Sequence, residues 1–273
     1  MKRFKRRWRQ EEDEAFEAAG EFMGEDKEVE SYDKKEGRDE EIAVRLPMAY
    51  TEPVYWEQML LLYESALEEI RTKVNVLTRE FKLKNGYSPI EHITTRIKHP
   101  ESIFKKMKKK NLAPLIQNVI RYVNDVAGVR IICSYTSDIY SIAGMLTNQA
   151  DVTVLSVKDY IANPKPNGYQ SYHMIVTVPV YLSDCVKQTK VEIQIRTSAM
   201  DFWASLEHKM NYKYAGQLPP HIKRELKECA DIAAFLDRKM LALHEEILQN
   251  DEEEKEHQVG VDISVEKNIW QIM

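Results

Sequence analysis

Two acidic side chains beside predicted strands are the first candidates for chemistry. Asp125 lies three residues before the apolar run GVRIICS (128–134), and Glu192 lies within VEIQIRT (191–197). If the two strands are neighbours, the carboxylates can hold Mg²⁺, a hard cation that takes one or two carboxylates together with phosphate oxygens. The ordinary alternative is a strand face turned to solvent and an acid that satisfies nearby backbone groups.

Alternation along each of these runs separates polar from apolar side chains. In the second run the polar face carries Glu192, Gln194 and Arg196, and the apolar face carries Val191, Ile193 and Ile195. In the first run Arg130 alternates with Val129 and Ile131. We therefore expect one face of the sheet to be core and the other to be available for solvent or for a ligand.

A basic segment, RIKHPESIFKKMKKK (96–110), is the second candidate. Its apolar residues recur at helical spacing, and Pro100 favours a helix start, with Ser102 in the first turn. Its cations include Arg96, Lys98, Lys105, Lys106, Lys109 and Lys110. Cations beside a helix N-terminus favour phosphate, because free N–H groups and the positive end of the helix dipole meet there. Three readings stay open: a nucleoside polyphosphate, a nucleic-acid backbone, or a solvated surface.

The loop NPKPNGYQSYH (163–173) is the third candidate. Its prolines restrict the backbone, and Asn167-Gly168 predicts a turn with positive φ just before Tyr169. A ring held in this way loses little entropy when a nucleobase stacks on it, and such stacking contributes about 1–3 kcal/mol. Lys165 can reach phosphate, while Asn167 and His173 can hydrogen-bond a ribose or a base. The alternative is a loop tyrosine that covers the core.

The elements that must position these residues follow from periodicity. Apolar residues recur every three or four positions from Trp56 to Leu77, which predicts a helix that ends at Asn85-Gly86. A second helical pattern covers 115–123, and four strands are predicted at 128–134, 152–157, 173–180 and 190–196, with a helix over 139–148 between the first two. Helices follow through Tyr212 and from Ile222 to about Leu248. This order predicts an α/β domain with a mixed sheet flanked by helices.

Composition bounds the rest. The chain has 273 residues and a net charge of −5, so no overall basic field points to nucleic acid. Cys133, Cys185 and Cys229 are far apart and odd in number, which suits a reducing compartment and disfavours both a disulfide framework and a structural zinc site. No membrane span or secretory signal is recognised, so a cytoplasmic protein is expected.

Residues 1–45 and 251–273 differ in composition from the domain expected over 46–250. The first segment is basic and then acidic, with few branched apolar residues, and is expected to be disordered. A contact of its basic start with nucleic acid or an acidic surface, and an over-extended gene start, stay open. The last segment is expected to be an acidic, then amphipathic, tail.

Five ordered segments resemble the RelA/SpoT-type synthetase domain, and specifically the small alarmone synthetases of the RelP and RelQ types. They are RIKHPESIFKKM, DVAGVRIIC, NPKPNGYQSYH, VEIQIRT and AMDFWASLEHK, within a match from about Tyr55 to Leu248. The resemblance implies transfer of the β,γ-pyrophosphate of ATP to the 3′-hydroxyl of GDP or GTP, giving AMP and (p)ppGpp. It also implies Mg²⁺, a fold resembling polymerase-β-like nucleotidyltransferases, and a homotetramer that needs no nucleic acid for activity, although RNA contact stays open.

The resemblance assigns roles position by position. It implies metal binding by Asp125 and Glu192, with Glu192 as the base for the 3′-hydroxyl. The residues that it implies for ATP are Arg96, Lys98, Ser102, Lys106, Lys109 and Arg130. Those that it implies for GDP or GTP are Lys158, Lys165, Asn167, Tyr169, His173, Gln194, Arg196 and Ala204.

Two departures from the family's motifs limit the activity and the subtype that we expect. None of the seven histidines is followed by Asp, so the His-Asp motif of the family's hydrolase domain is missing and synthesis without hydrolysis is expected. RelQ-type members bind pppGpp at a cleft lined partly by the segment equivalent to PIEHITT, where an aromatic is expected in place of His92. This departure favours the RelP type.

Two other classes of function remain as alternatives. One is a non-catalytic nucleotide- or RNA-binding regulator, which has no need of Asp125 or Glu192. The other is a polymerase-β-like nucleotidyltransferase, which would release pyrophosphate instead of AMP. The sequence has no P-loop, and no Gly-Ser followed by an Asp-x-Asp pair.

Overall fold

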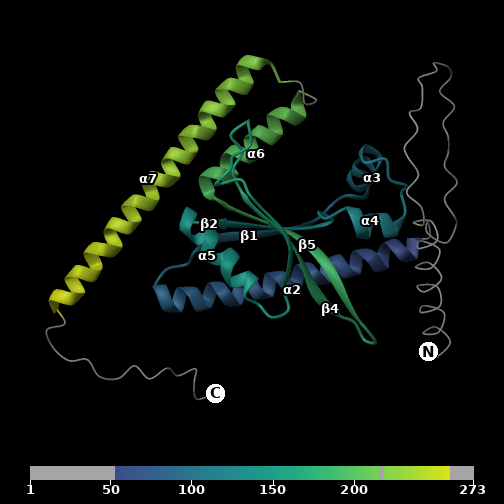
Figure 1. The fold of residues 1–273 in the computed structure, drawn as a ribbon, viewed down its shortest axis with the longest axis horizontal. Helices are drawn as coiled ribbons and strands as arrows, with labels where there is room; N and C mark the ends of the chain where they lie inside the picture. The colour runs from purple at the N-terminus through teal and green to yellow at the C-terminus, as the bar shows by residue number, and fades with distance from the viewer. Residues whose placement is uncertain (1–52, 215–217, 259–273) are drawn as a thin grey trace, which may run out of the picture. The chain divides into compact units, whose positions relative to one another are not determined.

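A mixed sheet of five strands forms the centre of the domain, in the order β1-β2-β5-β4-β3 (Figure 1). The computed structural model describes residues 53–214 and 218–258. The strands are β1 (Ile90–Ile97), β2 (Ala127–Cys133), β3 (Thr153–Asp159), β4 (Tyr172–Tyr181) and β5 (Val186–Thr197). Only β2 and β5 pair in parallel, and the other pairs are antiparallel. The mixed α/β sheet predicted from the sequence is therefore confirmed.

Six described helices accompany the sheet. They are α2 (Pro53–Asn85), α3 (Pro100–Lys109), α4 (Ile116–Tyr122), α5 (Thr136–Thr147), α6 (Ser198–Lys213) and α7 (Pro220–Gln258). The long helix α2 runs beneath the strands in Figure 1, and it contacts β1, β2, β4 and β5. Its apolar stripe, from Met59 through Ile70 to Leu77, is buried with the apolar side chains of the sheet. The face of the sheet that carries Val191 and Ile193 is thus closed, and the opposite face stays free for the polar side chains.

Strand β1 was not predicted from the sequence. Its apolar residues Ile90, Ile93 and Ile97 are spaced three and four apart, which imitates a helix. The structure shows an edge strand instead, whose register shifts between Ile90 and His92. Such a bulge returns Ile90 to the face of Ile93 without strict alternation.

Helix α7 also differs from its predicted length. It begins at Pro220 and continues to Gln258, beyond the predicted end near Leu248, so residues 251–258 of the predicted tail are helical. Residues 259–273 of that tail, and the segment 1–45, lie outside the described residues. Among the described helices, none combines the length and apolar character needed to cross a membrane.

Candidate active site

The polar side chains of the sheet lie in two rows that cross several strands. Strand register aligns Arg96 of β1, Gly128 of β2 and Glu192 of β5 in one row. The next row joins residues of four strands: Arg130, Gln194, His173 and Lys158. Residues paired across neighbouring strands project to the same face. The condition set for the carboxylate pair is therefore met, because β2, which follows Asp125, pairs with β5, which carries Glu192. Glu192 shares its face with Arg96 and His173.

Glu192 projects from β5 with only part of its carboxylate open to solvent. Its Oε2 accepts a hydrogen bond of 2.9 Å from Nε2 of Gln194, and Nδ1 of His173 lies 3.9 Å from Oε1, beyond hydrogen-bond distance. In the same row, the side chain of Arg96 lies beside Gly128, since a Cβ placed on Gly128 would be 3.7 Å from Cγ of Arg96. The absence of a side chain at 128 thus leaves room for the arginine between β1 and Glu192.

Asp125 lies just before β2 and holds two lysines. Nζ of Lys98 donates to its Oδ2 at 2.6 Å. Nζ of Lys106 lies 2.8 Å from the buried Oδ1 as an ion pair, without the alignment of a hydrogen bond. Burial raises the pKa of Asp125, but the lysines lower it by more, so the net pKa lies below its usual value. Asp125 is therefore an anion at neutral pH.

Helix α3 presents one stripe of polar side chains toward this end of the sheet. Ile103 and Met107 are buried and anchor the helix. Ser102, Lys106 and Lys109 follow at spacings of four and three, so they share a helix face. The helix begins with Pro100, and His99 makes no side-chain hydrogen bond to cap it. The N–H groups of Ser102 and Ile103 donate to the carbonyl of His99 at 2.8 and 3.1 Å, so the first turn offers a phosphate the positive end of the helix dipole and the hydroxyl of Ser102.

The loop before β4 is a tight turn. Gly168 has φ +86°, as the Asn-Gly pair predicts, and its N–H donates to the carbonyl of Lys165 at 2.8 Å. Oδ1 of Asn167 accepts from the N–H of Tyr169 at 3.2 Å. The same asparagine donates to Glu207 of α6 at 3.3 Å. The turn therefore fixes the backbone of Tyr169 from both sides.

Tyr169 lies among aromatic rings and cations. The rings of Tyr160 and His173 meet it edge-on, at centroid distances of 5.9 Å each. Nζ of Lys165 lies 4.5 Å from its centroid, and the guanidinium of Arg196 lies 5.1 Å from it. Tyr160 was not singled out from the sequence; its position directly after β3, beside Lys158, is the signal that could have found it.

A chain of hydrogen bonds determines the tautomer of His173. Arg196 donates to the hydroxyl of Tyr169, because a guanidinium has no acceptor. The hydroxyl proton is then free for Nε2 of His173, which lies 2.8 Å away. Burial and the nearby cations Arg196, Lys165 and Lys158 lower the pKa of His173 to about 4. His173 is therefore neutral, with Nε2 as acceptor and Nδ1–H on the side of Glu192.

Asp201, in the first turn of α6, is a site residue that sequence reasoning missed. Its Oδ1 lies 3.1 Å from Nη1 of Arg196 and 3.3 Å from Nη1 of Arg130. Burial lowers the pKa of Arg130, as does the charge of Arg196, while Asp201 opposes this effect. Asp201 thus offsets the repulsion between Arg130 and the buried Arg196. The motif AMDFWASLEHK contained it, but no role had been assigned to it.

Ala204 was predicted to line the nucleotide pocket, but its side chain is buried. It is buried with Trp203 and Ala230, and Tyr169 packs against this group. The structure thus places Ala204 beneath the tyrosine. The predicted residues fall into two groups, with Glu192 of β5 between them: Arg96, Lys98, Ser102, Lys106, Lys109, Arg130 and Asp125 on and around β1, β2 and α3, and Lys158, Lys165, Asn167, Tyr169, His173, Gln194, Arg196 and Ala204 around β3, β4, β5 and α6.

Comparison with known proteins gives the family. A model of the region found in RelA / SpoT proteins matches residues 95–217. A GTP pyrophosphokinase of Bacillus subtilis, YwaC, is 46% identical over 192 residues, which cover 70% of this chain and 91% of that protein. The chain belongs to the RelA/SpoT family. Within the family it groups with the small alarmone synthetases.

Solved structures of the family agree with this assignment. The crystal structure of small alarmone synthetase 2 from Bacillus subtilis is 46% identical, covers 70% of this chain and 98% of its own, and has a TM-score of 0.64. Small alarmone synthetase 1 from the same organism, bound to its product pppGpp, is 37% identical, with coverages of 71% and 98% and a TM-score of 0.65. These comparisons do not decide between the RelP and RelQ types, so the preference drawn from His92 stays a prediction.

Proposed function

We propose that this protein is a GTP pyrophosphokinase that transfers the β,γ-pyrophosphate of ATP to the ribose 3′-hydroxyl of GDP or GTP. The products are AMP and ppGpp or pppGpp. The observation that carries the proposal is the shared polar face, on which Glu192 lies between a cationic group on β1 and α3 and an aromatic group around Tyr169. Two anionic nucleotides can meet only where cations offset their repulsion, and both groups supply them.

ATP binds on the side of β1 and α3. The first turn of α3 and the stripe of Ser102, Lys106 and Lys109 receive the phosphates, with Arg96, Lys98 and Arg130 around them. Lys98 and Lys106 pair with Asp125 at 2.6 and 2.8 Å. They would exchange this carboxylate for phosphate oxygens as ATP enters, because both groups compete for the same ammonium donors.

GDP or GTP binds on the side of Tyr169. Its guanine stacks on the ring, and the neighbouring polar groups of Asn167, His173 and Gln194 offer hydrogen bonds. Lys158 and Lys165 supply cations for the acceptor's phosphates. Arg196, which the sequence assigned to the nucleotide, is buried, and it instead holds the ring through its hydrogen bond to the hydroxyl of Tyr169, while Ala204 supports the ring from beneath. Lys165 lies over the rings of Tyr160 and Tyr169 at 4.7 and 4.5 Å, so it would shift when a base stacks on that side.

Glu192 acts as the base. A ribose hydroxyl is a weak nucleophile until a carboxylate takes its proton, and Glu192 is the carboxylate in the row between the two groups. The neutral His173 beside it presents Nδ1–H without adding a positive charge that would lower the basicity of Glu192. The 3′-oxygen attacks the β-phosphorus, the bond to the α-phosphate oxygen breaks, and AMP leaves.

Mg²⁺ suits the donors available. Oδ1 of Asp125 is a buried carboxylate oxygen paired with Lys106 at 2.8 Å, so a metal would compete with this ammonium, and Glu192 supplies a second carboxylate. In the described part of the chain, no group of three or more His, Cys, Asp or Glu side chains could hold a metal by itself. Asp125 and Glu192 would therefore hold the ion together with substrate phosphates, where it would neutralise phosphate charge.

Assembly is proposed from α7. Large apolar side chains are exposed along one side of it at helical spacing: Ile232, Phe235, Leu236, Met240, Leu243, Ile247 and Leu248. An apolar stripe of this extent on a soluble domain favours burial against another subunit. We propose that copies of this chain pair through α7 within a homotetramer, and that the enzyme works in the cytoplasm without requiring nucleic acid.

Product analysis tests the function. Purified protein incubated with ATP, GDP and Mg²⁺ should give AMP and ppGpp in equal amounts by anion-exchange chromatography, with no AMP when GDP is omitted. ADP or free pyrophosphate as the main product, or nucleotide binding without turnover, would contradict the proposal.

A further inference from the structure

The loop before β4, which carries Tyr169, packs on helix α7 through a contact that leaves no room for another atom. A Cβ built on Gly168 would lie 2.4 Å from Cβ of Ala230 and 3.1 Å from Cδ of Lys227. Real Cβ atoms do not approach so closely, so Gly168 and Ala230 already touch at the limit of packing. Both residues are buried, and Ala230 is 5% exposed.

The same contact lies beneath Tyr169. Trp203, Ala204 and Ala230 form a small buried cluster apart from the main core, and Tyr169 packs against it. Nε1 of Trp203 donates to the carbonyl of Leu226 at 2.7 Å, which fixes the indole to α7. The ring that is proposed to stack on guanine is therefore supported from α6 and α7 as well as from its own turn.

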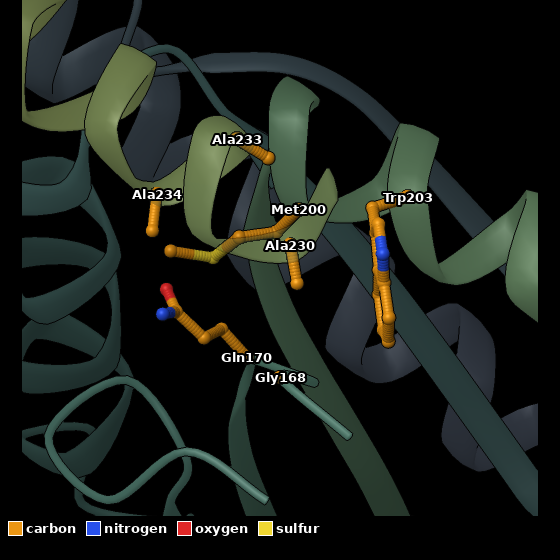
Figure 2. Close-up of a pocket in the computed structure, with 7 residues that line it drawn as sticks. All are labelled: Gly168, Gln170, Met200, Trp203, Ala230, Ala233 and Ala234. Carbon is orange, nitrogen blue, oxygen red and sulfur yellow. The ribbon is translucent and has the colours of Figure 1, made fainter. Parts of the chain in front are cut away.

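Figure 2 shows this junction from the side of Gln170, whose amide is directed toward Met200 and Ala234. The residues of α7 that line it are Ala230, Ala233 and Ala234. The space left between them is about 10 Å³, which is at the lower limit for a single water molecule. The junction is thus a packing surface and not a ligand site.

We propose that Ala230 is a positioning residue for the acceptor nucleotide: its small side chain sets the height of the Gly168 turn, and thereby the position of Tyr169. This inference rests on the proposed function. A larger side chain at 230 adds γ atoms to a junction in which Ala230 already lies against Gly168 and the remaining space is about 10 Å³. The backbone of Gly168 has no flexible end to move aside. The turn must shift, and Tyr169, the next residue, shifts with it. The ATP side, on β1 and α3, has no part in this contact.

A graded series tests the proposal: Ala230→Ser, Ala230→Cys and Ala230→Val, with Ala242→Val as the matched control. Ala242 is exposed on the same helix, so the control repeats the cost of a β-branched residue without touching the loop. Tyr169→Ala sets the limit for complete loss of stacking. Steady-state KM values for GDP and ATP, GDP binding by equilibrium dialysis, and thermal unfolding are measured on the full chain.

The KM and the dissociation constant for GDP should rise with side-chain volume, by about tenfold for Ala230→Val, which is within the range that loss of base stacking produces. The KM for ATP should stay within about twofold, because a shift of the Tyr169 ring does not change the contacts that bind ATP. Should the valine variant not fold, the serine and cysteine variants carry the same comparison.

Two results would overturn the inference: folded variants with unchanged affinity for GDP, or equal rises in the KM for GDP and for ATP. Turnover by the wild-type protein distinguishes a failure of this inference about Ala230 from a failure of the proposed function. If the wild-type protein makes no AMP from ATP and GDP, the proposed function is wrong; if it does and the series is flat, only the role of Ala230 is wrong.

Discussion

The proposed chemistry depends on the carboxylate of Glu192, which takes the proton of the ribose 3′-hydroxyl. Replacement by Gln keeps the shape and the contact with Gln194 but removes the proton acceptor. We expect Glu192→Gln to lower kcat by about 10²–10⁴-fold, the usual contribution of a general base. The KM for GDP should change little, since proton transfer acts mainly in the transition state, whereas the KM for ATP should rise because Glu192 is also a proposed ligand of the Mg²⁺ that binds with the phosphates.

The measurement is steady-state AMP formation at saturating ATP and GDP. Glu228→Gln, at an exposed position of α7, is the control for a lost carboxylate and should keep wild-type rates. Full activity of Glu192→Gln would contradict the role of Glu192 as base.

His173 predicts a dependence of stability on pH. Its folded-state pKa, about 4, lies below the ordinary value of 6.5, so the folded protein favours the neutral ring. Its contribution is fully present above pH 6.5 and is lost as pH falls from there toward about 4. The loss is at most about 3 kcal/mol of unfolding free energy, the equivalent of that shift.

Urea unfolding at pH 7.5, 6, 5 and 4.5 measures this loss. His173→Gln keeps an acceptor for Tyr169 but does not titrate, so its decline with pH should be shallower. Parallel curves for the two proteins would rule out His173 as the source of the decline.

The sequence predicted those parts of the site that depend only on the alternation of side chains along a strand. Glu192, Gln194 and Arg196 share a face because successive side chains on a strand must point to opposite sides. Asp201 and Tyr160 were missed because their roles come from tertiary contacts: Asp201 reaches two arginines on different strands, and Tyr160 meets rings of a different segment. No local spacing encodes either meeting.

At the scale of the elements, a hydrogen bond from Thr197 links β5 to α7. Its hydroxyl donates to Oδ2 of Asp237 at 2.6 Å and accepts from the N–H of Met200 at 3.2 Å. It thus caps the start of α6, whose first turn carries Asp201. Burial raises the pKa of Asp237, which the hydrogen bond from Thr197 opposes.

Thr197→Val should therefore lower the free energy of unfolding by about 1–3 kcal/mol, because a half-buried carboxyl and a helix N-terminus each lose a partner. Thr197→Ser, which keeps the hydroxyl, should stay close to wild type. Urea unfolding of the three proteins is the measurement, and equal losses for valine and serine would show that packing and not hydrogen bonding matters at this position.

The elements themselves were predictable to different degrees. Helix α2 and strands β2, β4 and β5 carry strong periodicity because each buries one face against a large core. Strand β1 has a single fully buried residue, Ile90, and a bulge that breaks alternation, so its sequence pattern imitates a helix. Strand pairing with β2, which no local pattern expresses, decides its conformation.

At the scale of the whole molecule, the exposed stripe of α7 predicts assembly. Phe235→Glu places a charge on this stripe and should shift the protein to a smaller species in size-exclusion chromatography with light scattering. Arg238→Glu, on the same helix but outside the stripe, should leave the assembly unchanged. A wild-type monomer, or a Phe235→Glu protein of wild-type mass, would contradict the proposed role of α7.

The central claim is that β- and γ-phosphates move together onto a guanosine acceptor. ATP labelled with ³²P at the β position decides it, because each class of transfer sends that atom to a different product. Incubation with protein, GDP and Mg²⁺ followed by thin-layer chromatography should place the label in ppGpp, with AMP unlabelled. Label recovered in ADP would indicate transfer of the γ-phosphate alone, and label in free pyrophosphate would indicate nucleotidyl transfer or hydrolysis; either result would contradict the account.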